Sequence, residues 1–133
     1  MYKIITSEKK LLADTLTPVS IYLKIRDNFS NSLLLESSDY GANDNSYAYV
    51  CFNPIAHISI HGKFISKSFP CGKKENTEIN ENTDVVQQVD DFCKLFDCRK
   101  NEKKFINNGV FGYMNYDSVK YFENIHVKSK KAV

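Results

Sequence analysis

Residues 56–67 read Ala-His-Ile-Ser-Ile-His-Gly-Lys-Phe-Ile-Ser-Lys, and this stretch decides the fold. Its first half alternates, with Ile58 and Ile60 on one face and two histidines and a serine on the other. A period of two predicts a β-strand with one buried face. Gly62-Lys63 then suits a tight turn into a second apolar run that begins at Phe64. The stretch therefore predicts an antiparallel hairpin.

Two further strands are predicted upstream of this hairpin. Ser32–Glu36 is a short apolar run (SLLLE) that stops in a polar cluster. Tyr47–Phe52 (YAYVCF) is aromatic and β-branched, and Pro54 ends it. Both runs have the length and composition of buried strands.

Two helices are predicted from their capping signals. Thr17-Pro18 begins the first, because threonine caps free backbone N–H groups and proline at the first helical position has none to lose. Its apolar spacing continues to Phe29. Thr83-Asp84 begins the second, and its apolar stripe consists of Val85, Val89, Phe92 and Phe96.

The remaining segments complete an α+β prediction. Residues 71–82 have almost no large apolar side chain, so we expect a mobile connection there. Residues 109–116 predict a last strand, and Asp117 begins a short helix. The order of elements predicts one domain over residues 1–133, with a mainly antiparallel β-sheet flanked by helices.

Composition excludes several classes of protein. The 42% hydrophobic and 26% charged residues are ordinary for a soluble domain. A formal charge of +2 gives no argument for a nucleic-acid partner. No apolar stretch approaches the roughly 18 residues of a membrane helix, and the start lacks a signal peptide, so we expect no membrane contact and a cytoplasmic protein. Its four cysteines then read as reduced thiols.

Chemistry-bearing motifs are scarce, and one segment stands out. Phosphate-binding loops and hydrolase motifs are absent, and His57 and His61 lack an evident third metal ligand. Glu36, directly after three leucines, places a carboxylate at the edge of the core, and Ser37 offers a hydroxyl beside it. This arrangement suits a zwitterionic amino acid with an apolar side chain. The alternative is that Glu36 pairs with a lysine and the serines begin a turn.

Four motifs resemble the N-terminal region of anthranilate synthase component I. They are Pro18–Lys24 (PVSIYLK), Ser32–Ser37 (SLLLES), Tyr47–Val50 (YAYV) and Gly109–Glu123 (GVFGYMNYDSVKYFE). In that family the complete enzyme is a lyase of tryptophan biosynthesis, which converts chorismate to anthranilate and pyruvate. It uses Mg²⁺ and ammonia from a glutamine amidotransferase subunit. The resemblance implies that residues 1–133 are the regulatory domain, without the C-terminal chorismate-binding domain, and that this fragment alone has no catalytic residue or cofactor.

The resemblance also implies part of a feedback site for L-tryptophan. Leu35, Glu36 and Ser37 would line the indole ring and meet the polar end of the ligand. A second stretch, commonly Arg-Tyr-Ser in relatives, corresponds here to Ser-Tyr-Ala. The changed outer positions leave backbone contacts at Tyr47 and Ala48 as the expected contribution. The absent domain would supply the rest of the pocket.

Two other functions compete with this interpretation. Component I of aminodeoxychorismate synthase has a related N-terminal region and can share the Leu-Leu-Glu-Ser motif. A free-standing amino-acid-binding module belongs to a different class of protein. A large exposed apolar face would favour a portion of an enzyme over such a module, because monomers rarely expose one.

Overall fold

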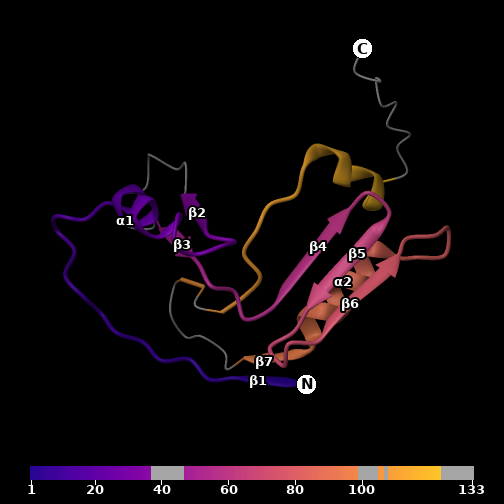
Figure 1. Ribbon diagram of the computed structural model, residues 1–133, viewed down its shortest axis with the longest axis horizontal. Coiled ribbons are helices and arrows are strands. Elements are labelled where there is room, and N and C mark those ends of the chain that lie inside the picture. The colour runs from indigo at the N-terminus through magenta and orange to yellow at the C-terminus, as the bar shows by residue number, and fades with distance from the viewer. Residues whose placement is uncertain (37–46, 99–104, 107, 124–133) are drawn as a thin grey trace, which may run out of the picture.

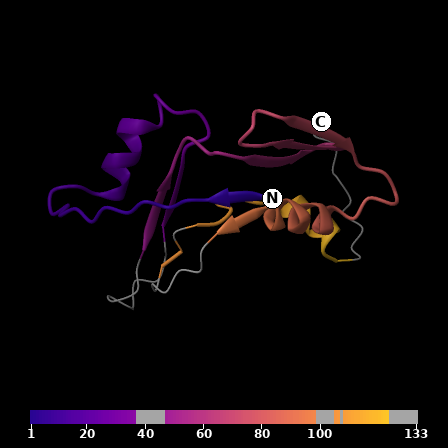
Figure 2. The same cartoon turned by 90° about the horizontal axis from the view of Figure 1, so that it is seen from below.

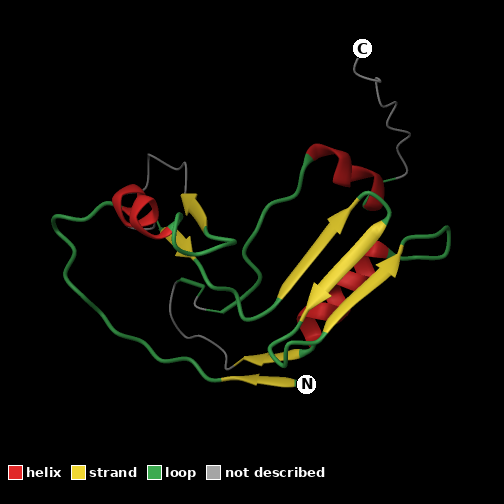
Figure 3. Cartoon of the chain, viewed as in Figure 1, coloured by secondary structure: helices red, strands yellow, loops and turns green. Residues whose placement is uncertain are grey.

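The computed structural model describes residues 1–36, 47–98, 105–106 and 108–123. In chain order the elements of this part are β1 (Tyr2–Ile4), α1 (Pro18–Ile25), β2 (Leu33–Glu36), β3 (Ala48–Cys51), β4 (His57–His61), β5 (Phe64–Ser68), β6 (Lys74–Glu78), α2 (Val85–Lys94), β7 (Phe96–Cys98) and the 3₁₀-helix η1 (Tyr116–Tyr121). The strands form three small sheets, β1–β7, β2–β3 and β4–β5–β6, and only the first is parallel (Figures 1 and 3). The predicted α+β fold with mainly antiparallel pairing is confirmed.

The predicted hairpin is present as β4 and β5. Ile60 pairs with Ile65, and Gly62 takes a φ of +59° in the turn, a conformation that suits glycine. Ile65 is fully buried, whereas its neighbour Phe64 is 54% exposed on the opposite face. The predicted alternation thus holds for these two residues of β5, but Ile60, on the predicted buried face of β4, is 37% exposed.

Helix α2 covers the apolar face of the β4–β5–β6 sheet (Figure 2). Asp84 caps it, because its Oδ1 accepts a hydrogen bond of 2.9 Å from the backbone N–H of Gln87. The Phe92 and Phe69 rings meet with centroids 5.8 Å apart. In the described part of the chain, the buried apolar side chains all belong to this contact; they are Ile65, Phe69, Val85 and Phe92.

The second helix ends earlier than predicted, and Phe96 is not part of its stripe. The chain leaves the helix at Leu95, and Phe96 begins β7. Phe96 keeps its contact with Phe92, at 5.3 Å between ring centroids, and also stacks on Tyr2 at 5.5 Å. Pairing with the N-terminal strand β1 thus replaces another helical turn.

Helix α1 begins at the predicted residue but ends before the predicted one. Thr17 and Ser20 form a reciprocal capping box, with the Ser20 N–H bonded to the Thr17 hydroxyl at 3.1 Å. The predicted extension to Phe29 is wrong, because the helix ends at Ile25. The Asn28 side chain donates to the Lys24 carbonyl at 3.0 Å, and such side-chain bonds compete with further helical bonds.

Two other predictions are corrected. Residues 71–82 are not an irregular connection throughout, because Lys74–Glu78 form β6 beside β5. An edge strand is held by its backbone ladder and tolerates polar side chains, so the lack of apolar residues was misleading. Residues 109–116 form no strand up to Asn115, and Tyr116 begins η1 with Asn115, not Asp117, at its N-cap. No neighbouring strand pairs with them in the described chain.

Candidate functional site

The β2–β3 ladder carries the segment that stood out in the sequence. Its antiparallel register pairs Leu35 with Tyr49 and Glu36 with Ala48. Helix α1 contacts both strands. None of its residues is buried, and Val19 and Leu23 remain 45% and 49% exposed. The ladder and its helix thus form an open unit, with much apolar surface left for contact.

The structure brings four of the five predicted ligand-binding residues to one end of this ladder. Glu36 and Ala48 lie opposite each other and are exposed, whereas Leu35 and Tyr47 are half-buried. Ser37 lies outside the described residues. Because opposed residues share a face and consecutive residues alternate, Leu35 lies on the face of Tyr47, and Glu36 on the other face with Ala48. A ligand meeting all of them must lie across the end of the ladder.

Glu36 has no ion pair among the described residues. The alternative interpretation, in which a lysine neutralises this carboxylate, therefore finds no such lysine in the part of the chain that the structure describes. An exposed carboxylate at the end of a ladder is free to meet a cation from solution.

Aromatic contacts join Tyr47 and Tyr49 to two phenylalanines, Phe105 and Phe111. The Tyr47 and Phe105 rings lie 6.0 Å apart, and those of Tyr49 and Phe111 lie 5.3 Å apart. The Ile106 backbone N–H also donates to the Tyr49 hydroxyl at 3.1 Å. Sequence analysis missed Tyr49 as a contact residue. The period of two placed it on the face of Tyr47, but nothing local identified a partner 57 residues away.

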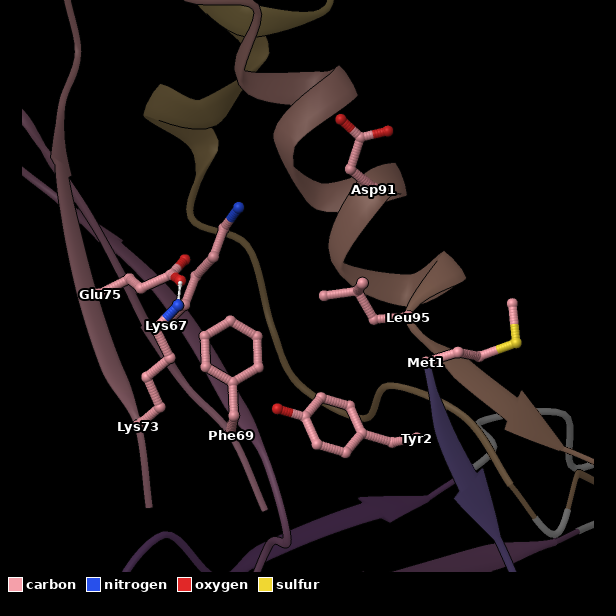
Figure 4. A pocket seen from close by; sticks show the side chains of 8 residues that line it. All are labelled: Met1, Tyr2, Lys67, Phe69, Lys73, Glu75, Asp91 and Leu95. Carbon is pink, nitrogen blue, oxygen red and sulfur yellow. Dashed lines mark ion pairs between the residues drawn. The ribbon is translucent and has the colours of Figure 1, made fainter. Parts of the chain in front are cut away.

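A hollow of about 320 Å³ beside α2 is a second candidate site (Figure 4). Tyr2, Phe69 and Leu95 form its apolar part. Its charged groups already have partners within the chain. Lys67 donates to the Gln88 side chain at 2.8 Å, and Lys73 pairs with Glu75 at 2.6 Å. The β2–β3 end differs, because Glu36 there has no ion-pair partner in the described part of the chain.

A thiol stands near the Tyr2 side of this hollow. The Tyr2 hydroxyl and Cys71 Sγ are 3.2 Å apart. This hydrogen bond, followed by one from the Lys73 backbone, lowers the pKa of Cys71 below its usual value. The same hydrogen bond is the largest cause that raises the pKa of Tyr2, because it stabilises the protonated hydroxyl. All four cysteines are free, as expected for reduced thiols.

Among the described residues, no group of three or more His, Cys, Asp or Glu side chains could hold a metal ion. The ligands that Mg²⁺ would need are thus not gathered in this part of the chain.

In the same residues, no helix is long and apolar enough to cross a membrane.

Comparison with known proteins identifies relatives of one kind. No family model and no solved structure matches the chain. Three curated relatives are named anthranilate synthase component 1. Those of Aquifex aeolicus, Pseudomonas putida and Lactococcus lactis are 28%, 32% and 25% identical over 96%, 84% and 94% of this chain. The chain spans only 22–25% of the length of these relatives. The predicted resemblance is thus confirmed: over nearly its whole length, this chain is related in sequence to about a quarter of anthranilate synthase component 1.

Proposed function

We propose that this chain is the regulatory part of an anthranilate synthase component 1 and holds part of its site for L-tryptophan. The observation that carries the proposal is the position of Glu36. Its carboxylate is exposed, has no cationic partner among the described residues, and stands opposite Ala48 at the end of the β2–β3 ladder.

The chemistry of this end suits a zwitterionic aromatic amino acid. Glu36 is the partner for the ammonium group, because charge-assisted hydrogen bonds are the stronger ones. Leu35 and the Tyr47 ring supply apolar surface for the indole at the same end of the ladder, on the face opposite Glu36. Ser37 is next in the chain and supplies a hydroxyl for the polar end of the ligand.

The remaining function belongs to a longer polypeptide. In this proposal, conversion of chorismate to anthranilate and pyruvate takes place in a chorismate-binding part, which also holds Mg²⁺. A glutamine amidotransferase subunit supplies the ammonia. The present chain performs no catalysis by itself. Its exposed apolar side chains support this division, because Leu12, Tyr113 and Tyr116 are 86%, 87% and 84% exposed, more than a self-sufficient domain requires.

Two observations favour this proposal over its alternatives. The exposed apolar surface disfavours a free-standing amino-acid-binding module. The curated relatives are named anthranilate synthase component 1, which favours that enzyme over aminodeoxychorismate synthase.

Regulation follows from a difference in tryptophan affinity between two arrangements of the polypeptide. Tryptophan stabilises the arrangement that binds chorismate poorly. A coupling free energy of about 1–3 kcal/mol, or ~5–150-fold in affinity, is typical of such regulation.

The test is Glu36→Gln in the polypeptide as it occurs in the source cells. Losing the charged partner of the ammonium group weakens inhibition by tryptophan by about 10–100-fold, because hydrogen bonds to charged groups contribute about 1.5–3 kcal/mol. Turnover without tryptophan stays near the parent value. Glu78→Gln is the matched control, because Glu78 is also exposed at the end of a strand. Inhibition curves of Glu36→Gln that overlay those of the parent would contradict the assignment.

A further inference from the structure

Residues 105–106 and 108–122, here called the coupling segment, expose an unusual amount of apolar surface. Six large apolar side chains in it are 57–87% exposed; they are Ile106, Val110, Tyr113, Met114, Tyr116 and Phe122. Residues 105–116 contain no charged side chain. A solvated surface segment normally carries charges, so this composition fits a segment that packs against other protein.

The N-terminal part of the same segment contacts residues of the proposed tryptophan site and of strand β3. Ile106 donates its backbone N–H to the Tyr49 hydroxyl, and Phe111 packs against the Tyr49 ring. Phe105 packs against Tyr47, whose neighbour Ala48 stands opposite Glu36. A change in the position of β3 on ligand binding must therefore act on this segment.

We propose that the coupling segment docks onto the chorismate-binding part of a component 1 polypeptide and transmits tryptophan occupancy from β3 to it. This inference rests on the proposed function. The Tyr49 contacts form its inner side, and the exposed apolar residues from Val110 to Phe122 form its docking side.

The length of the relatives identifies the occupant. The chain matches 22–25% of each relative, so component 1 proteins have about three quarters of their length to cover such a surface. Docking also accounts for the strand pattern of residues 109–116, which is unpaired here. A Cβ added at Gly112 would meet nothing within 4 Å, so a neighbouring backbone has room to approach at this point.

Docking is tested by photo-crosslinking in the source cells, with a photoreactive phenylalanine analogue in place of Tyr113. Leu12 is the matched control position, because it is 86% exposed against 87% for Tyr113 but lies far from the segment in sequence. We expect crosslinks from position 113 to peptides of the chorismate-binding part, several-fold more than from position 12. Crosslinks only to other proteins, equal yields at both positions, or no crosslink would each overturn the docking.

Coupling is tested by Tyr49→Phe in the same polypeptide. This change removes the hydroxyl that accepts the Ile106 N–H but keeps the ring against Phe111. We expect the tryptophan concentration for half-inhibition to shift by about fivefold, the effect of one typical hydrogen bond. Tyr22→Phe is the control, because no hydrogen bond of the Tyr22 hydroxyl is found among the described residues.

The outcomes separate the inference from the proposed function. A parent polypeptide that tryptophan does not inhibit would overturn both the proposed function and the coupling. An inhibited parent whose Tyr49→Phe variant gives the same inhibition curve would overturn the coupling alone. Crosslinking at position 113 together with the shifted inhibition of Tyr49→Phe supports the whole inference.

Discussion

At the scale of single residues, Cys71 stands out because a hydrogen bond lowers the pKa of its thiol below the usual value. Its thiol is exposed and lies 3.2 Å from the hydroxyl of Tyr2, which is 69 positions away in the sequence. This hydrogen bond is the largest of the effects that lower the pKa of Cys71. A lower pKa means that more thiolate is present at neutral pH, and the thiolate is the reactive form.

We expect Tyr2→Phe to slow the alkylation of Cys71 by iodoacetamide. The ring is retained, but the hydroxyl that stabilises the thiolate is lost, so the pKa of Cys71 rises toward its usual value. The pH profile of the reaction then moves to higher pH, and the rate near pH 7.5 falls. Peptide mass spectrometry over a pH series measures this rate for each cysteine.

The control for this experiment is Cys93 in the same protein, which is also exposed but far from Tyr2 in sequence. Its alkylation rate should stay constant between parent and Tyr2→Phe. An unchanged pH profile for Cys71 would show that the hydroxyl does not stabilise the thiolate.

The residues of the candidate site were only partly predictable. The strands that carry Leu35, Glu36 and Ala48, with Tyr47 directly before the second strand, follow from local composition, and their alternation follows from strand geometry. The contacts of Tyr49 with Ile106 and Phe111 depend on a long-range approach of two segments. Such an approach leaves no signal in either segment alone.

At the scale of elements, α2 depends on a single cap. Asp84 accepts the Gln87 N–H and satisfies one of the free donors of the first turn. The helix holds Val85 and Phe92 in the buried contact with the sheet. Loss of the cap therefore weakens the element on which this core rests.

We predict that Asp84→Ala lowers the free energy of unfolding by about 1 kcal/mol, the usual effect of removing an N-cap side chain. Asp84→Asn is the control, because asparagine caps helices about as well as aspartate does. Urea unfolding followed by circular dichroism measures both variants. Equal stability of Asp84→Ala and Asp84→Asn would contradict a capping role.

The elements that sequence analysis recovered are those with local signals. The β4–β5 hairpin and the starts of both helices are set by turn and capping residues within a few positions. The parallel pair of β1 and β7 joins Tyr2 to Phe96, and no local pattern indicates it. Strand β6 is polar and was missed, whereas residues 109–116 have a strand pattern without a partner.

At the scale of the whole molecule, burial is unevenly distributed. The β4–β5–β6 sheet and α2 share the buried side chains, whereas α1 on the β2–β3 ladder contributes none. Local stability follows the density of buried contacts, so the two units should open with different free energies. The proposed tryptophan site lies in the less stable unit, where a ligand can most easily shift the structure.

Hydrogen exchange should show this difference, with the backbone amides of β5 and α2 exchanging more slowly than those of α1, β2 and β3. We expect Ile65→Ala to remove about 2–5 kcal/mol from the protection of the slow set, because it leaves a cavity in the only buried contact of the described chain. Phe64→Ala, on the exposed face of the same strand, is the control and should cost much less. Uniform protection across both units would contradict the uneven burial.

The parallel pairing of β1 with β7 also has a consequence during synthesis on the ribosome. The residues of β4, β5, β6 and α2 leave the ribosome close together and contain their own partners. Tyr2 leaves it before all of these residues, yet its stacking partner Phe96 follows 94 positions later. Strand β1 must therefore wait for β7 before it can pair, although β1 is synthesised before every other element described here.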